Sequence, residues 1–165
     1  MKIGIIGDTH DNLPLISRVV DILSREHVDL VLHTGDYIAP FVIPLLGKIP
    51  ARIVGVFGNN DGDRELLLTR SLEQSNINLA GYFTELILDG EKIALLHGHD
   101  RSLLAHCLEC GEYDIVVHGH THKPSIQLLE STIDINPGEV CGYLTGNPTY
   151  AMYHTKKKDA RIVSL

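Results

Sequence analysis

The stretch Lys2-Ile3-Gly4-Ile5-Ile6-Gly7-Asp8-Thr9-His10 joins a short apolar run to a turn that carries an aspartate and a histidine. A short apolar run bounded by such a turn is typical of a buried β-strand. Aspartate and histidine side chains are ligands for divalent transition metals. The start of the chain therefore predicts a strand with metal-binding side chains at its end.

Similar segments recur four times further along the chain, each after a predicted strand. They are Gly35-Asp36, Gly58-Asn59-Asn60-Asp61, His97-Gly98-His99 and Gly119-His120-Thr121-His122. Asp8 and His10 are two residues apart, and in an extended segment this spacing places both side chains on the same side. Each segment alone is a weak signal, because a Gly-Asp pair is usually only a turn. Together they predict enough donors for two metal sites.

Alternating strands and helices in the first half of the chain predict a parallel sheet. The predicted strands are 2–7, 30–33 and 52–57, and the predicted helices are 13–27 and 63–75. A brief helix interrupted by Pro40 and Pro44 is expected at 38–46.

The second half of the chain has the pattern of antiparallel hairpins. Asp89-Gly90 lies between two apolar runs and is a strong hairpin signal. The predicted strands are 83–88, 92–97, 114–118, 125–130, 132–136, 149–155 and 160–165, and a helix is predicted at 101–110. Parallel units followed by hairpins indicate two sheets packed face to face, with helices outside.

The composition is that of a globular protein. We expect the 165 residues to form one domain, and the 44% of hydrophobic residues suffices for a packed core. The formal charge of −7 argues against general affinity for nucleic acid or acidic membranes. No apolar run approaches the ~20 residues of a membrane span, and the first residues do not resemble a signal peptide. A cytoplasmic location is expected.

Three cysteines do not indicate a disulfide framework. The pair Cys107-x-x-Cys110 lies in a predicted helix and is interpreted as two small buried side chains. A redox or metal-binding role is the other interpretation of this pair.

The ordered set of Asp-x-His, Gly-Asp, Gly-Asn-x-Asp, Gly-His and Gly-His-x-His segments resembles the calcineurin-like metallophosphoesterase superfamily. The chain is most similar to its small single-domain phosphodiesterase branch from archaea and bacteria. The resemblance covers residues 4–122, and Asn136-Pro137-Gly138 resembles a turn common in that branch. It implies an α/β fold with a four-layer α/β/β/α sandwich, in which two mixed sheets pack together and helices lie outside.

The resemblance also implies a dinuclear metal centre at one end of the sandwich. One ion would be held by Asp8, His10 and His122, and the other by Asn59, His97 and His120. Asp36 would bridge the two ions. Manganese or nickel is expected first, while iron, zinc and cobalt also fit oxygen and imidazole ligands.

The activity implied is hydrolysis of phosphodiester bonds, with a hydroxide between the metals as the nucleophile. The expected partner is a small phosphodiester; a membrane or a stably bound nucleic acid is not expected. Self-association is left open. A phosphomonoesterase or nuclease of the same family, or a non-catalytic scaffold with this fold, are the alternatives.

One position departs from the pattern of the family. Many relatives have a histidine where this chain has Asn60, and an amide cannot act as a general acid. His99 is a candidate substitute, or else a structural histidine. By resemblance Asp61 orients a histidine ligand, and its other interpretation is a turn or helix-capping carboxylate. Besides Asp36, the predicted catalytic residues are therefore Asn60, Asp61 and His99.

Overall fold

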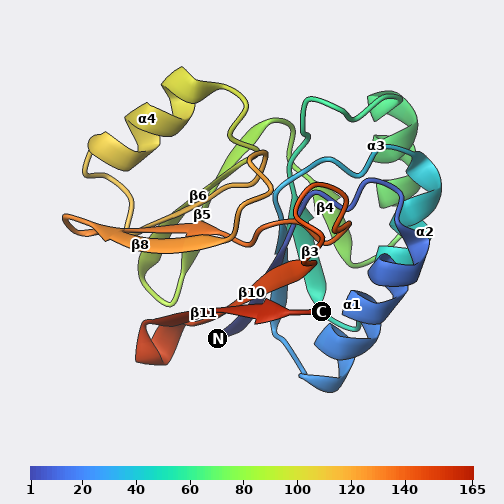
Figure 1. Ribbon diagram of the computed structural model, residues 1–165, viewed down its shortest axis with the longest axis horizontal. Coiled ribbons are helices and arrows are strands. Elements are labelled where there is room, and N and C mark those ends of the chain that lie inside the picture. The colour runs from blue at the N-terminus through green and yellow to red at the C-terminus, as the bar shows by residue number, and fades with distance from the viewer.

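Two β-sheets form the centre of the computed structural model, which describes residues 1–165 (Figure 1). The first sheet has the order β11-β10-β1-β2-β3-β4 and the second the order β5-β6-β7-β9-β8. The first sheet contains β1 (Lys2–Ile6), β2 (Leu30–His33), β3 (Arg52–Gly55), β4 (Ile77–Leu79), β10 (Thr149–His154) and β11 (Asp159–Ser164). The second contains β5 (Phe83–Leu88), β6 (Glu91–Leu96), β7 (Ile115–Val117), β8 (Ser125–Leu129) and β9 (Thr132–Asn136).

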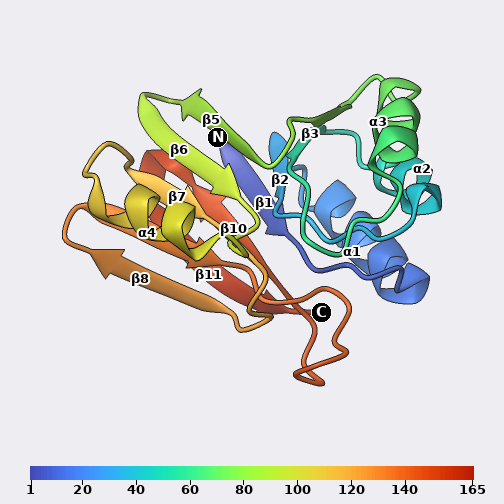
Figure 2. The ribbon, with the colours of Figure 1, turned by 90° about the horizontal axis from the view of Figure 1, so that it is seen from above.

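Helices cover the outer faces of both sheets. They are α1 (Leu13–Arg25), α2 (Ile43–Leu46), α3 (Arg64–Leu72) and α4 (Arg101–Glu109), with 3₁₀ turns η1 (Pro40–Val42) and η2 (Thr155–Lys157). Figures 1 and 2 place α1, α2 and α3 on one side of the molecule and α4 on the other. No helix has the length and apolar character needed to cross a membrane.

Local sequence explains the longest helix. The Asn12 side chain accepts a hydrogen bond from the backbone N–H of Leu15 and caps α1, and a proline lies in the first turn, where its missing N–H is not needed. The buried side chains follow helical spacing: Ile16, Val19, Val20 and Leu23.

Three apolar clusters fill the space between the outer helices and the two sheets and between the sheets themselves. Ile3 and Ile5 of β1 pack with Leu95 of β6 and Val117 of β7 between the sheets. A second cluster joins α1, α2 and α3 to the outer face of the first sheet, and a third joins Cys107 of α4 to the second sheet. The predicted four-layer α/β/β/α sandwich is confirmed.

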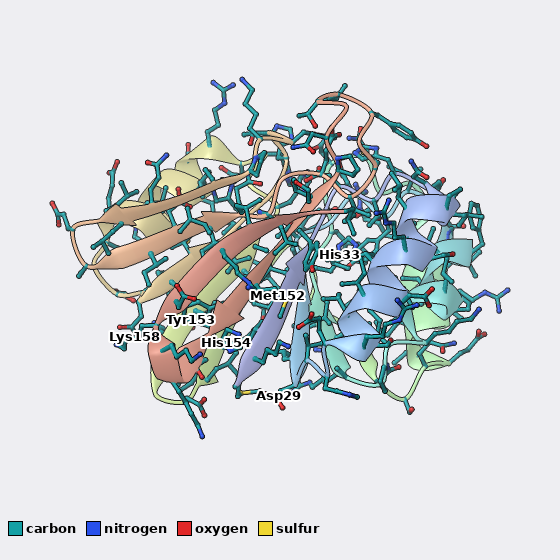
Figure 3. All side chains as sticks on the ribbon, turned by 60° about the horizontal axis from the view of Figure 1, so that its bottom comes forward. Asp29, His33, Met152, Tyr153, His154 and Lys158 are labelled. Atoms are coloured by element: carbon teal, nitrogen blue, oxygen red, sulfur yellow. The ribbon has the colours of Figure 1, made fainter.

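Parallel pairing brings the carboxyl ends of the central strands to one edge. Strands β1, β2, β3 and β4 pair in parallel, as do β6, β7 and β9. Asp29 and His33 in Figure 3 mark the two ends of β2, and the functional loops follow the end marked by His33. Side chains that follow these strands are therefore held close together.

The structure corrects several details of the prediction. The three-residue strand β4 was missed, because Ile77–Leu79 is too short to show a periodic pattern. The brief, proline-interrupted helix expected at 38–46 is a 3₁₀ turn followed by one turn of α-helix. Cys107 is buried as expected, whereas Cys110 is only half-buried. The hairpin at Asp89-Gly90 is confirmed, with Leu88 paired to Glu91.

Candidate metal centre

All five segments singled out in the sequence converge at the strand ends. The first three follow β1, β2 and β3, and the last two follow β6 and β7. Five of the candidate ligands have backbone φ angles between 39° and 68°, a region that non-glycine residues rarely adopt: Asp8, His10, Asp36, His120 and His122. Such strained backbone is concentrated at functional sites.

The left-handed backbone corrects the expectation for Asp8 and His10. The φ angle is 47° at Asp8 and 39° at His10, so this segment is not extended. The two side chains approach each other because the backbone curls, with His10 Nε2 lying 3.9 Å from Asp8 Oδ1. The β-strand spacing argument was therefore wrong, although it predicted the proximity correctly.

One group of donors contains Asp8, His10, Asp36 and His122. Their ligand atoms all lie within 4.8 Å of one another. His10 Nε2 is 3.3 Å from Asp36 Oδ2, and His122 Nε2 is 3.3 Å from Asp8 Oδ1. Asp8 and Asp36 have no exposed surface. This is the set predicted for the first ion together with the bridging residue.

The second predicted group surrounds His97. Its Nε2 lies 3.0 Å from Asn59 Oδ1 and 3.4 Å from Asp36 Oδ2, and its Nδ1 donates to the carbonyl oxygen of Thr34 at 2.9 Å. The ring of His120 is 5.1 Å from that of His97, centroid to centroid. Asp36 Oδ2 thus faces His10 on one side and His97 on the other.

The donors of the first group fit a divalent cation. Asp8 Oδ1 and His10 Nε2 are buried without a hydrogen-bond partner. Unpaired buried polar atoms of this kind are costly and rare. The donors are carboxylate oxygens and imidazole nitrogens, which first-row divalent metals accept. A cation among these atoms would satisfy them.

Contacts among the charged groups alter their pKa values in the metal-free protein. The closeness of the Asp36 and Asp8 carboxylates raises the pKa of His10 to about 9. Burial alone would lower the pKa of His97, but the neighbouring Asp36 outweighs it and raises that pKa. Burial would raise the pKa of Asp36, yet His10 and His97 hold it far below its usual value. The carboxylates therefore attract positive charge at this site.

Two glycines allow the loops to approach the carboxylates. A Cβ atom on Gly58 would lie 2.1 Å from Asp36 Oδ1, and one on Gly119 would lie 2.7 Å from Asp8 Oδ2. Both distances are far below van der Waals contact. Only glycine fits at these positions while the aspartates keep their place.

The residues predicted to be catalytic have distinct surroundings. Asn60 donates its backbone N–H to Asp36 Oδ1 at 2.9 Å and its side-chain amide to Asp36 Oδ2 at 2.8 Å. His99 is exposed, with its ring 5.5 Å from that of His97 and 6.2 Å from that of His120. Both residues therefore lie beside the candidate ligands.

Asp61 does not orient a histidine, and that prediction was wrong. Its buried carboxylate accepts hydrogen bonds from the backbone N–H groups of Asp36, Tyr37, Ile38 and Gly58, at 2.7–3.2 Å. Loop backbone that leaves a strand end has unpaired N–H groups, and one carboxylate satisfies four of them. Asp61 therefore holds the two loops that carry Asp36 and Asn59, as in the turn interpretation.

Glu139 is a member of the site that sequence reasoning missed. Its buried carboxylate accepts a hydrogen bond from His122 Nδ1 at 2.7 Å, and it also binds Cys141, Leu144 and Thr145. Burial would raise the pKa of Glu139, but these hydrogen bonds lower it to about 2. The one signal in the sequence was its place directly after the Asn136-Pro137-Gly138 turn.

The Glu139 contact determines how His122 faces Asp8. Because His122 Nδ1 donates its hydrogen to Glu139, its other ring nitrogen, Nε2, faces Asp8 Oδ1 at 3.3 Å. Two acceptors at this distance repel unless a proton or a metal ion lies between them. This supports the fit of the site to a cation.

Comparison with known proteins identifies the family. The family model of the calcineurin-like phosphoesterase superfamily domain matches residues 1–158. A phosphodiesterase of Methanocaldococcus jannaschii is 40% identical over 165 residues, covering 100% of this chain and 99% of that protein. Phosphodiesterase YfcE of Escherichia coli is 24% identical and covers 92% of this chain and 86% of its own length.

Solved structures agree with the fold. The structure of an archaeal phosphodiesterase has a TM-score of 0.95 with 39% identity, covering 100% of both chains. The structure of Vps29 from Entamoeba histolytica, solved with zinc, has a TM-score of 0.71 at 20% identity, covering 100% of this chain and 98% of the Vps29 chain. At this level of identity the similarity shows a shared fold alone. The chain belongs to the calcineurin-like phosphoesterase superfamily, as its resemblance indicated.

Proposed function

We propose, from its membership of the calcineurin-like phosphoesterase superfamily, that this protein is an enzyme that hydrolyses small phosphodiesters at a dinuclear metal centre. The proposed ligands are Asp8, His10, Asp36, Asn59, His97, His120 and His122. The observation that carries the proposal is the cluster of Asp8, His10, Asp36 and His122, whose ligand atoms lie within 4.8 Å. The names of the M. jannaschii and E. coli relatives support the choice of phosphodiesters.

Asp36 is the proposed bridge. Its Oδ2 lies 3.3 Å from His10 Nε2 and 3.4 Å from His97 Nε2, between the two groups of donors. One ion would be held by Asp8, His10 and His122, and the other by Asn59, His97 and His120. Manganese or nickel is proposed, and iron, zinc or cobalt has the same ligand preferences.

The side chains of this centre are held by neighbours. Asn60 donates to both oxygens of Asp36, the Thr34 carbonyl accepts from His97 Nδ1, and Glu139 accepts from His122 Nδ1. Such contacts fix ring orientation and make the opposite nitrogen a better ligand. When bound, two divalent ions would supply charge that binds phosphate oxygens and lowers the pKa of a water molecule, whose hydroxide can attack phosphorus.

The proposed substrate is a small molecule. The formal charge of −7 disfavours a stable complex with nucleic acid, while two divalent ions would outweigh the two carboxylates at the site. The alternatives are phosphomonoesterase or nuclease activity, or a scaffold role. The complete set of candidate ligands supports an enzyme.

Metal analysis combined with a diester assay tests the proposal. The purified protein, stripped with a chelator and reloaded with manganese, should bind two ions per chain and cleave bis(p-nitrophenyl) phosphate. Parallel assays with p-nitrophenyl phosphate and single-stranded DNA separate the alternative activities. A protein that retains two ions but cleaves none of these compounds favours the scaffold role; one that binds no metal refutes the proposal.

A further inference from the structure

A cavity of about 490 Å³ adjoins the candidate metal centre. Asn59 and His97, two of the candidate metal ligands, are among the residues that line it. The rest of the wall comes from Arg64 at the start of α3, Tyr82 before β5, and the segment around the start of α4, which contributes Leu96, Gly98, His99, Asp100 and Leu103. Its volume lies in the range of small-molecule pockets, about 300–1,000 Å³, and far exceeds the size of one phosphate group. There is room for one ester arm of a phosphodiester beside the site of the scissile phosphate.

Arg64 supplies an unpaired positive charge to this cavity. Arg64 takes part in no ion pair. Apart from histidines, the cations that do are the Met1 amine, Lys2, Arg70, Lys92 and Lys158. Its Nη2 donates to the Gly58 carbonyl only at 3.5 Å, and its buried Nε has no partner. A guanidinium group offers five N–H donors that match the oxygens of a phosphate.

Tyr82 holds the guanidinium group in place. The central carbon of the Arg64 guanidinium lies 5.4 Å from the centroid of the Tyr82 ring, a cation–π contact. The rings of Tyr82 and Phe57 pack edge to face, with centroids 5.9 Å apart. The contact places the Arg64 guanidinium group against one face of Tyr82, at the wall of the cavity.

The one carboxylate that lines the cavity is already engaged. Asp100 Oδ1 accepts hydrogen bonds from the backbone N–H groups of Ser102 and Leu103, both at 3.0 Å, and so caps α4. Asp100 keeps its negative charge, but it forms no ion pair with Arg64. The free N–H donors of Arg64 therefore make its part of the wall complementary to an anion.

We propose that Arg64 binds a second phosphate group, carried by the ester arm that enters the cavity. The preferred substrates would then be phosphodiesters with a further phosphate near the scissile one. This inference rests on the proposed function, because a metal ion held by Asn59 and His97 would place the scissile phosphate on the side of the cavity that these two residues line. The scissile phosphate itself is the competing ligand for Arg64, and the test distinguishes the two.

Two matched esters test the inference in the manganese-loaded protein. Thymidine 5′-(p-nitrophenyl phosphate) is compared with the same ester carrying a 3′-phosphate, since both release p-nitrophenolate. Arg64→Gln should lower kcat/KM for the 3′-phosphorylated ester about tenfold or more, which is the usual effect of losing a charge-assisted hydrogen bond. The same variant should change kcat/KM for the plain ester less than about twofold. Arg70→Gln is the matched control, because Arg70 is on the same helix but pairs with Glu73. Equal losses on both esters, or no loss, would overturn the inference.

A binding measurement separates this inference from the proposed function. Calorimetry compares thymidine 3′,5′-bisphosphate with thymidine 5′-monophosphate, using wild-type and Arg64→Gln protein. The variant should weaken binding of the bisphosphate about tenfold or more and leave the monophosphate nearly unchanged. If the wild type cleaves neither these esters nor bis(p-nitrophenyl) phosphate, the proposed function fails and the Arg64 site is judged by binding alone. Bisphosphate affinity that is the same in both proteins would refute the site.

Discussion

His122 donates its Nδ1 hydrogen to the carboxylate of Glu139 at 2.7 Å, and Glu139 has no exposed surface. The same carboxylate accepts the backbone N–H and the hydroxyl of Thr145. One buried residue therefore joins a candidate metal ligand to the loop that follows Cys141. The orientation of His122 depends on a residue that carries no metal-binding signature of its own.

Glu139→Gln should weaken metal binding without preventing it. Loss of the carboxylate that orients a histidine ligand typically costs about 10–100-fold in affinity. Titration of chelator-stripped protein with manganese measures the change. Glu85→Gln is the control, because Glu85 bonds Tyr113 and Lys92 far from the site. Unchanged affinity in the Glu139 variant would show that the contact has no such role.

Asp36→Asn should cause the largest loss of activity among the proposed ligands. The substitution removes the negative charge that faces both His10 and His97, so two cations would repel each other without compensation. We expect a loss of about 100-fold or more in kcat/KM, together with fewer than two bound ions. Asp21→Asn on the exposed surface of α1 is the comparison. A variant with two ions and full rate would contradict the bridging role.

Asn60 should limit the range of leaving groups. An amide cannot donate a proton near neutral pH, so activated aryl diesters should be cleaved faster than alkyl diesters. Asn60→His should narrow that difference, and the measurement is kcat/KM over a series of diesters with leaving groups of different pKa. An unchanged dependence would mean that position 60 acts only through its hydrogen bonds to Asp36.

The metal-free protein should lose stability as the pH rises from about 6.5 to 9. The pKa of His10 is raised from 6.5 to about 9, so its protonation stabilises the fold fully below pH 6.5 and ceases to do so above 9. This rise corresponds to at most roughly 3–4 kcal/mol in the free energy of unfolding. Urea unfolding of stripped protein at several pH values measures it. His10→Gln should reduce the dependence of the free energy of unfolding on pH over this range. If the dependence stays the same in the variant, it arises from groups other than His10.

Gly58→Ala should damage both the fold and the site. The new Cβ atom would lie 2.1 Å from Asp36 Oδ1, so either the loop or the carboxylate must move. Overpacking of this kind costs roughly 1–3 kcal/mol. Gly62→Ala is a matched control, because the nearest atom to its Cβ is 4.0 Å away. Gly58→Ala should lower both the midpoint temperature of thermal unfolding and the affinity for manganese measured by titration. Gly62→Ala should leave both quantities unchanged.

Much of the fold follows from local patterns. The run before Asp8 is a buried strand because continuous apolar residues favour burial on both faces, and Asp89-Gly90 forms a hairpin because its turn chemistry is local. The four-layer arrangement follows from parallel units followed by hairpins. The two prolines likewise predict the interrupted helix at 38–46. In contrast, β4 depends on packing that periodicity does not report.

The sequence by itself determined the chemical identity of the candidate ligands and their place after the strands. It could do so because donor type and strand patterning are properties of neighbouring residues. Only the tertiary structure decided which donors meet, how the backbone turns them, and what supports them. The backbone N–H of His120 and the carboxylate of Asp8, for example, form a hydrogen bond across 112 positions of the chain. The partners of Asp61 and Glu139 and the unpaired charge of Arg64 likewise arise from contacts between distant segments, which no local pattern encodes.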